Sequence, residues 1–263
     1  MNKTKKIAVI ICVVLILLLL FLGIKFGQKV DKSTESKSSV FSEVASHESL
    51  KLVDDDGSYN IPYRLFVPDG YEKMQPLPVV LFLHGIDENG TDSEHVNVNN
   101  DLLVNLTENF YSQFPAIIIA PQAPLYFAWG PGLLTAIIDE IERIQDKYGA
   151  DKNRLYVTGQ SMGGNGVWLM LAMFPDKIAA AVPLSAGGDS EQVEKFKHVP
   201  IWVFHGADDD ICPPEQSLII VNALKNVGGN VKYTEFPSVG HESWVQAYAK
   251  KELYEWMFSQ RLN

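Results

Sequence analysis

Short apolar runs that alternate with segments of helical periodicity are the feature that most restricts the fold of this chain. Residues 79–83 (VVLFL) and 116–120 (AIIIA) are continuous apolar runs, as expected of strands that are covered on both faces. Residues 133–148 instead carry isoleucines at helical spacing and are followed by Gly149, a residue type that commonly ends helices. The alternation predicts an α/β fold with a mainly parallel sheet of about eight strands and helices on both faces.

The same patterns predict the remaining elements. Further strands are expected within residues 44–53 and at residues 59–67, 155–157, 178–184, 201–204 and 231–236. Further helices are expected at residues 166–174, 214–227 and 242–260. We interpret residues 43–263 as one domain.

The N-terminus carries an apolar segment of a different kind. Residues 7–24 contain no charge, and Lys3, Lys5 and Lys6 precede them. A membrane-spanning helix needs about 20 apolar residues, whereas the apolar region of a signal peptide has about 7–15 and is followed by small residues at the cleavage site. We therefore expect residues 1–30 to be an uncleaved anchor with one transmembrane helix and the body of the protein outside the cytoplasm. A cleaved signal, which would give a secreted protein, is the alternative.

Residues 31–42 are rich in serine, lysine and glutamate and are expected to form a tether. The lysines of residues 1–30 are not matched by any acidic residue there, so the rest of the chain is more acidic than the net charge of −10. Such a body should repel phosphate backbones, and nucleic acid is not an expected partner. Cys12 lies in the apolar N-terminal run and Cys212 lies in the body of the chain, so no disulfide between them is predicted.

A candidate nucleophile lies between a predicted strand and a predicted helix. Residues 159–163 read Gly-Gln-Ser-Met-Gly, the G-x-S-x-G pattern in which a serine sits on a sharp strand-to-helix turn. A serine hydroxyl is a weak nucleophile and needs a general base. Ser161 is therefore a catalytic candidate, and the alternative is a glycine-rich turn with a buried serine.

The base and the acid follow the serine in sequence. His241 comes just after the last predicted strand, although it could also be a capping residue of the last helix. Three aspartates, Asp208, Asp209 and Asp210, follow the strand at residues 201–204. The order Ser, Asp, His suits a triad in which the acid orients the histidine, but spacing alone does not choose among the aspartates.

Backbone N–H groups are needed to bind the oxyanion of an acyl-transfer intermediate. One is expected from Met162, the residue after the nucleophile. The other is expected from the loop after residues 79–83, where we favour the N–H of Ile86, with Gly85 as the second choice. The plain alternative for His84-Gly85 is a simple turn.

Taken together, these segments resemble the α/β-hydrolase superfamily. They are most similar to its bacterial esterase branch, which includes feruloyl esterase-like and polyhydroxybutyrate depolymerase-like proteins and predicted peptidases. The resembling segments are residues 63–72, 77–92, 120–124, 154–168, 174–189, 200–213 and 232–248.

The resemblance implies an α/β-hydrolase fold and selects one aspartate. Laid on residues 205–213, the pattern H-G-x-x-D-x-x-V-P places the acid at Asp209, with Cys212 where valine is usual. It also implies that Gln122, Trp129 and Trp244 lie near the active site as substrate-binding residues. His205 would support the loop that carries Asp209. No cofactor or metal is expected.

The expected function is that of a serine hydrolase that cleaves carboxylic esters by a Ser-His-Asp acyl-enzyme mechanism and acts on small-molecule or cell-surface esters. The first alternative is a serine peptidase with the same triad. The second is a non-catalytic surface-binding protein on a hydrolase scaffold.

Overall fold

The computed structural model describes residues 41–43, 49–54, 57–74, 76–90, 101–125 and 128–262, with side chains from Ile61 onward. Within these residues, no helix combines the length and the apolar character that crossing a bilayer requires. The predicted membrane segment at residues 7–24 and most of the predicted tether lie outside them.

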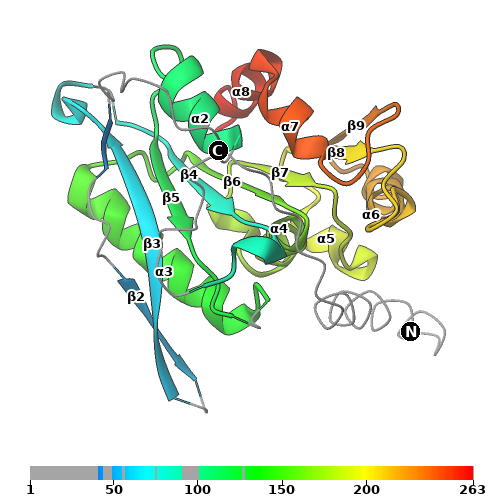
Figure 1. Cartoon of the computed structure of the whole chain (residues 1–263), viewed down its shortest axis with the longest axis horizontal. Coiled ribbons are helices and arrows are strands. Elements are labelled where there is room, and N and C mark those ends of the chain that lie inside the picture. The colour runs from blue at the N-terminus through cyan, green and yellow to red at the C-terminus, as the bar shows by residue number, and fades with distance from the viewer. Residues whose placement is uncertain are drawn as a thin grey trace, which may run out of the picture. The chain divides into compact units, whose positions relative to one another are not determined.

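A mixed sheet with the order β1-β3-β5-β4-β6-β7-β8-β9 forms the centre of the fold (Figure 1). Its strands from β5 to β9 in this order are parallel to one another, while β3 runs antiparallel to β5 and to β1. A further strand, β2, forms an antiparallel hairpin with β3 that projects from the body. The strands are β1 (Phe41–Glu43), β2 (Ser49–Asp54), β3 (Gly57–Pro68), β4 (Val79–Leu83), β5 (Ile117–Pro121), β6 (Leu155–Gln160), β7 (Ala180–Leu184), β8 (Ile201–Gly206) and β9 (Val231–Phe236).

The apolar runs of the sequence become the central strands. Every residue of β4, β5, β6 and β7 is buried, which explains why these segments are continuously apolar instead of alternating. The predicted α/β fold with a mainly parallel sheet is confirmed.

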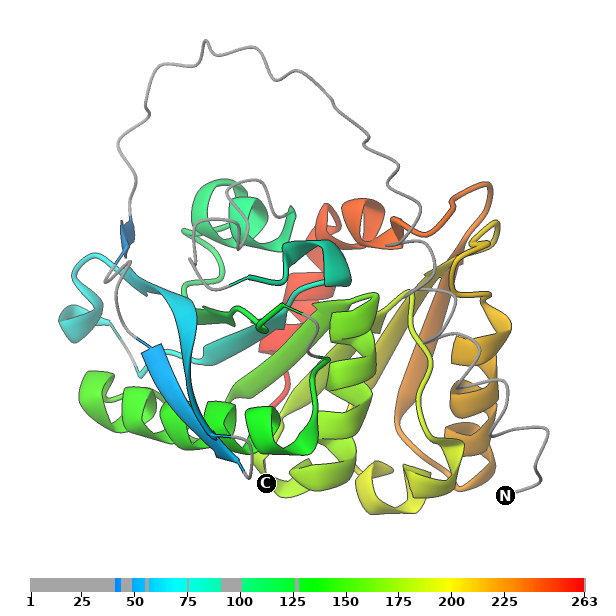
Figure 2. The same cartoon turned by 60° about the horizontal axis from the view of Figure 1, so that its bottom comes forward.

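Helices cover both faces of this sheet (Figure 2). On one face, α3 (Pro131–Tyr148), α4 (Met162–Met173), α5 (Val193–Phe196) and α6 (Glu215–Asn226) contribute to one hydrophobic core. On the other, α2 (Asp101–Val104), α7 (Ser243–Tyr248) and α8 (Lys251–Phe258) contribute to a second core. The sheet thus separates two cores, and its rigid centre holds the loops at the strand ends.

The predicted elements need three corrections. The helix expected at residues 166–174 begins earlier, at Met162. Its first turn contains glycines because close packing against neighbouring backbone leaves no room for a side chain there. The helix expected at residues 242–260 is divided into α7 and α8 by Lys250, whose ψ of 115° is extended. Strand β1 begins at Phe41, within the last residues of the predicted tether.

Loops at the carboxyl ends of the parallel strands carry the candidate residues. Ile86 follows β4, Ser161 follows β6, Asp209 follows β8 and His241 follows β9. The carboxyl ends of parallel strands meet at one edge of the sheet, where ligands bind in open α/β folds.

Candidate active site

Ser161 occupies a sharp turn between β6 and α4. Its φ of 53° and ψ of −119° lie in a region that a non-glycine residue rarely adopts. The turn requires glycines beside it, because a Cβ on Gly163 would lie 1.9 Å from the carbonyl oxygen of Leu83, and one on Gly159 would lie 2.6 Å from that of Gly163. The backbone therefore presents the Ser161 side chain at the edge of the sheet.

The imidazole of His241 bridges Ser161 and Asp209. Its Nε2 lies 2.8 Å from Ser161 Oγ, and its Nδ1 lies 2.8 Å from Asp209 Oδ2. Since a carboxylate only accepts hydrogen bonds, Nδ1 carries the hydrogen and Nε2 accepts from the serine hydroxyl. This is the arrangement in which a histidine removes the proton of a serine nucleophile.

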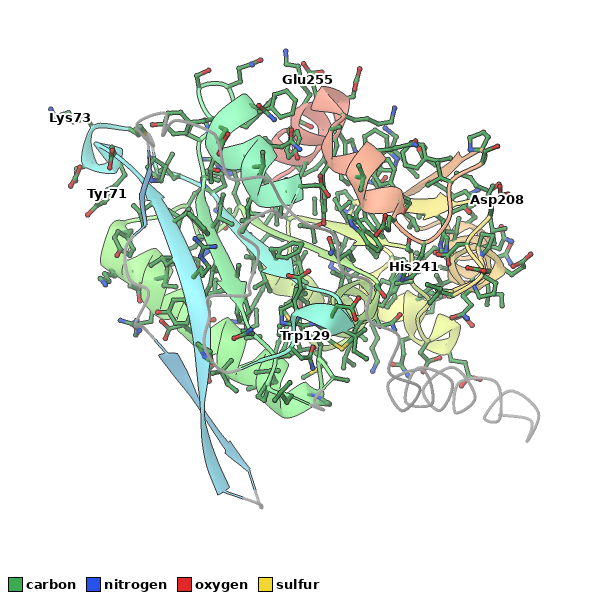
Figure 3. The ribbon with its side chains drawn as sticks, viewed as in Figure 1. Tyr71, Lys73, Trp129, Asp208, His241 and Glu255 are labelled. Atoms are coloured by element: carbon green, nitrogen blue, oxygen red, sulfur yellow. The ribbon has the colours of Figure 1, made fainter. Side chains whose placement is uncertain are left out.

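Asp209 is the buried member of the three adjacent aspartates. It is 4% exposed, whereas Asp208 and Asp210 are exposed, and Figure 3 shows Asp208 at the periphery of the molecule. Asp209 Oδ1 accepts hydrogen bonds from the N–H groups of Ile211 and Cys212, at 3.0 and 2.9 Å. The structure thus brings together the aspartate, histidine and serine that the sequence singled out.

The surroundings of Asp209 keep it ionised. Burial alone would raise the pKa of this carboxyl, but hydrogen bonds from His205, His241 and the Cys212 N–H outweigh burial and hold the pKa well below its ordinary range. A permanently negative Asp209 fixes the tautomer of His241 and stabilises its protonated form.

A second serine anchors the backbone of His241 and was not found from the sequence. Ser185 follows β7 with a φ of 46°, and its Oγ donates to the carbonyl oxygen of His241 at 2.7 Å. The same Oγ lies 2.7 Å from Ser243 Oγ. The one signal in the sequence is a serine directly after a buried strand.

The predicted oxyanion donors lie at two helix starts. Ile86 is the first residue of a short 3₁₀ helix (Ile86–Glu88), and Met162 is the first residue of α4. The N–H of such a position has no acceptor within its own helix. A Cβ built on Gly85 would lie 3.8 Å from Ser161 Cβ, so the loop that carries Ile86 runs beside Ser161.

His84 fixes the peptide that presents the Ile86 N–H. Its Nε2 accepts from the N–H of Ala123 at 2.9 Å, so its Nδ1 carries the hydrogen and donates to the Gly85 carbonyl at 2.6 Å. Burial lowers the pKa of His84 to about 4, against the smaller opposing effect of the Gly85 bond, so the ring is neutral. In a planar trans peptide the Ile86 N–H points opposite to the Gly85 carbonyl, so holding one orients the other.

The three predicted substrate-binding residues have different positions. Trp244 is partly buried, and its ring meets that of His241 edge to face at 5.3 Å between centroids. Trp129 is buried and donates from Nε1 to the His84 carbonyl at 3.0 Å. Gln122 is also buried and donates from Nε2 to the Glu88 carbonyl at 3.0 Å. Trp129 and Gln122 therefore support the loop of Ile86 and expose almost no surface to a ligand, contrary to the expected direct contact.

Among the residues that the structure describes, no group of three or more His, Cys, Asp or Glu side chains is arranged to hold a metal ion. Asp209, His205 and His241 do lie together, but each directs both of its polar atoms to a hydrogen-bond partner within the protein.

The sheet topology and the sharp turn at Ser161 between β6 and α4, the serine elbow, define the fold class of this protein. The chain has the α/β-hydrolase fold and is similar to esterases, as the sequence resemblance predicted. Residues 185–261, which include Asp209 and His241, match the model of the prolyl oligopeptidase family.

Three known proteins illustrate the relationship. A thermostable esterase of solved structure superposes with a TM-score of 0.76 and 35% identity, covering 84% of this chain and 63% of the esterase. A bifunctional acetylxylan esterase/xylanase from Neocallimastix patriciarum is 26% identical over 57% of this chain, and an uncharacterized secreted protein from Arthroderma benhamiae is 24% identical over 65%. The chain spans only 21% and 22% of the lengths of these two relatives.

Proposed function

We propose that this protein is a serine hydrolase that cleaves carboxylic esters, with Ser161, His241 and Asp209 as its catalytic residues. The observation that carries the proposal is the continuous hydrogen-bonded chain from Ser161 Oγ through His241 to Asp209, with both links at 2.8 Å. Residues 43–263 would form the catalytic domain.

Acylation begins at Ser161. His241 Nε2 takes the hydroxyl proton while Oγ attacks the ester carbonyl carbon, and the imidazolium that forms is stabilised by Asp209. The N–H groups of Ile86 and Met162 donate to the oxyanion of the tetrahedral intermediate. His241 then returns the proton to the departing alcohol oxygen, which leaves an acyl group on Ser161.

Deacylation repeats these steps with water. His241 removes a proton from a water molecule that attacks the acyl carbonyl, and the second tetrahedral intermediate uses the same two N–H donors. Collapse of this intermediate returns the proton to Ser161 Oγ and releases the acid.

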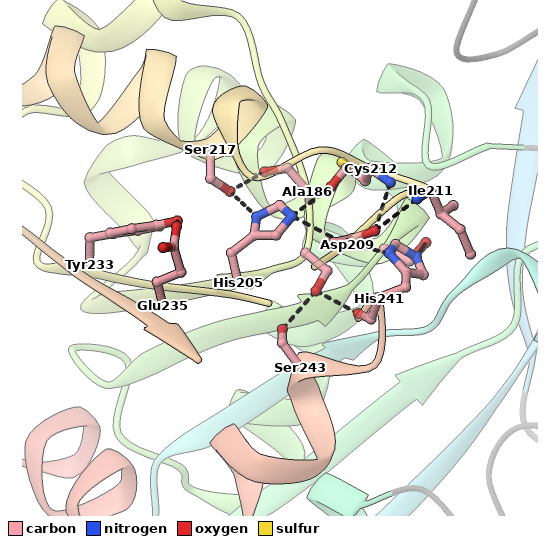
Figure 4. Close-up of polar contacts among 12 residues, drawn as sticks. Ala186, His205, Asp209, Ile211, Cys212, Ser217, Tyr233, Glu235, His241 and Ser243 are labelled. Carbon is pink, nitrogen blue, oxygen red and sulfur yellow. Dashed lines mark hydrogen bonds and ion pairs between the residues drawn. The ribbon is translucent and has the colours of Figure 1, made fainter. Parts of the chain in front are cut away.

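The position of Trp244 indicates where the alcohol part binds. The leaving oxygen must come within hydrogen-bonding distance of His241 Nε2, so groups beside this ring contact the alcohol side of the ester. Trp244 packs against the ring. Ile211, which is 53% exposed, lies on the neighbouring loop that carries Asp209 (Figure 4). Both favour esters whose alcohol part has an apolar face, such as aryl esters or acylated sugars.

The test is hydrolysis of a panel of p-nitrophenyl esters, acetylated and feruloylated sugars and peptide amides. We expect ester turnover by the wild type and a loss of roughly 10⁴- to 10⁶-fold in Ser161→Ala. Ser259→Ala is the matched control, because this exposed serine bonds to the carbonyl of Trp256 in α8. Substantial activity in Ser161→Ala would place the nucleophile elsewhere.

A serine peptidase is the second candidate. It is favoured by the match of residues 185–261 to the prolyl oligopeptidase family. The same triad can cleave amides, so the panel decides between the two. Faster turnover of the peptide amides than of every ester would make the peptidase the function.

We also propose that the catalytic domain acts outside the cytoplasm, tethered to the membrane by residues 1–30. The support is the apolar run at residues 7–24 with lysines before it. Secretion after cleavage is the alternative, and the secreted relative agrees with either outcome. Cell fractionation with N-terminal sequencing of the mature protein separates the two.

A further inference from the structure

His205 is a second histidine on Asp209, and its environment is unusual. It is fully buried at the end of β8, and its Nε2 lies 3.1 Å from Asp209 Oδ2, the oxygen that also accepts from His241. The same Nε2 lies 2.7 Å from the carbonyl oxygen of Cys212. Both neighbours of Nε2 are acceptors, so this nitrogen carries a hydrogen.

The other ring nitrogen of His205 faces Ser217 on α6 (Figure 4). His205 Nδ1 lies 2.7 Å from Ser217 Oγ, and this hydroxyl donates to the carbonyl oxygen of Ala186 at 2.7 Å. Ser217 has a single hydroxyl hydrogen, and the Ala186 carbonyl can only accept. With that hydrogen committed to Ala186, Ser217 Oγ must accept from Nδ1, which therefore also carries a hydrogen.

A neutral His205 would break this network. If Ser217 donated to Nδ1, the Ser217 and Ala186 oxygens would face each other at 2.7 Å without a hydrogen between them. Leaving a buried polar group without its partner costs about 1–3 kcal/mol. A doubly protonated ring avoids this cost, and its positive charge is compensated by the adjacent Asp209.

We propose that His205 is a permanently charged imidazolium and acts as a positioning residue for the catalytic base. Its two hydrogens hold Asp209 in place, while its charge offsets that of the carboxylate. This reduces the stabilisation that Asp209 gives to protonated His241, so that His241 remains an available base at lower pH. The inference rests on the proposed function, because it assigns a role within the same triad.

Several other groups share this environment. The groups in contact with His205 are Asp209 and Cys212 on the loop after β8 and Ser217 on α6. Glu235 is its register partner on β9, and His241 lies beyond Asp209. Glu235 is exposed and its Oε2 accepts from the Tyr233 hydroxyl. Asp209 is thus the only buried carboxylate in this set of described residues, and the pairing with His205 is local.

The charge can be measured on the wild-type protein itself, with a variant needed only to assign the signals. With ¹⁵N-labelled histidine, we expect both ring nitrogens of His205 to show protonated shifts from about pH 7.5 to pH 9, where free histidine is largely neutral. The signals are assigned by their absence in His205→Gln. A ring with one unprotonated nitrogen at neutral pH would overturn the proposal.

The kinetic test compares pH profiles of His205→Gln and wild type. Removing a cation near His241 favours the protonated base, so the acidic limb of kcat/KM should move to higher pH by at least about one unit. His198→Gln is the control, because His198 is half exposed and pairs with Asp176 at 3.4 Å. A purely structural role would instead lower kcat/KM equally at every pH and would contradict the proposal.

The two measurements separate this inference from the proposed function. If the wild type hydrolyses none of the substrates, the proposed function fails, while the nitrogen shifts still decide the charge of His205. If the wild type is active but the limb does not move in folded His205→Gln, the function stands and the inference fails.

Discussion

The hydroxyl of Ser185 donates to the carbonyl oxygen of His241 at 2.7 Å, across 56 positions of sequence. Ser185 has a φ of 46°, so this contact is made by a residue in a conformation that costs free energy. The bond ties the loop after β9 to the end of β7. It supports the backbone of the base, whereas Asp209 supports the ring.

Ser185→Ala should therefore lower kcat roughly 10- to 100-fold with little change in KM, because small displacements of a catalytic group are costly. Steady-state kinetics on a p-nitrophenyl ester measures the effect. Ser190→Ala, at the start of the short 3₁₀ helix Ser190–Gln192 that follows β7, should behave as wild type. An unchanged kcat in Ser185→Ala would mean that Asp209 alone positions the base.

Asp209→Asn should lower kcat by roughly 10⁴-fold, because an amide can donate to His241 Nδ1 and so favour the wrong tautomer. Asp208→Asn and Asp210→Asn are natural controls, since both side chains are exposed while Asp209 is 4% exposed. We expect both controls to remain close to wild type in the same assay. A larger loss in either control would require a different acid.

Gly163→Ala should destabilise the fold, although alanine normally favours a helix over glycine by about 1 kcal/mol. The new Cβ would lie 1.9 Å from the Leu83 carbonyl oxygen, so β4 and α4 must separate. We expect a loss of about 3 kcal/mol or more in the free energy of unfolding, measured by urea denaturation. Gly130→Ala, where a new Cβ would approach no closer than 3.9 Å to the Ala128 carbonyl oxygen, should cost far less.

Acid should destabilise the protein through His84. The folded pKa is about 4 and the ordinary value is 6.5, so the unfolded chain binds more protons between these values. Stability from the neutral ring is therefore complete above about pH 6.5 and is lost as the pH falls toward 4, by about 2 kcal/mol between pH 7 and pH 5.

The measurement is the difference in unfolding free energy between pH 7 and pH 5 in wild type and in His84→Gln. Other groups titrate in both proteins, so the smaller pH dependence of the variant isolates His84. Equal pH dependence would show that the ring gains its proton in the folded state without penalty. Asp209 acts at lower pH, because its depressed pKa adds stability above the unfolded value that is lost only in stronger acid.

The sequence predicted the sheet because fully buried parallel strands leave continuous apolar runs such as residues 79–83. It could not predict the division between α7 and α8, because residues 249–250 are Ala-Lys, with no glycine or proline to mark a break. Helix periodicity continues across this site, and only tertiary packing interrupts it.

For the site, the serine elbow was recognisable because its glycines are imposed by local geometry. The choice of Asp209 needed a family resemblance, since burial distinguishes it from identical neighbours only in the folded chain. Ser185 and Ser217 could not be singled out, because their roles depend on carbonyls that distant segments bring to them. Trp129 was expected to bind substrate, but it is buried and its indole N–H donates to the His84 carbonyl.

The triad also joins parts of the sheet that differ in their resistance to local opening. Ser161 follows β6, which is flanked by β4 and β7, whereas His241 follows β9, which pairs only with β8 among the described strands. Terminal strands of a sheet open at lower free energy than central ones. Heating should therefore abolish turnover at a temperature below the main unfolding transition, by releasing the base while the serine elbow remains intact.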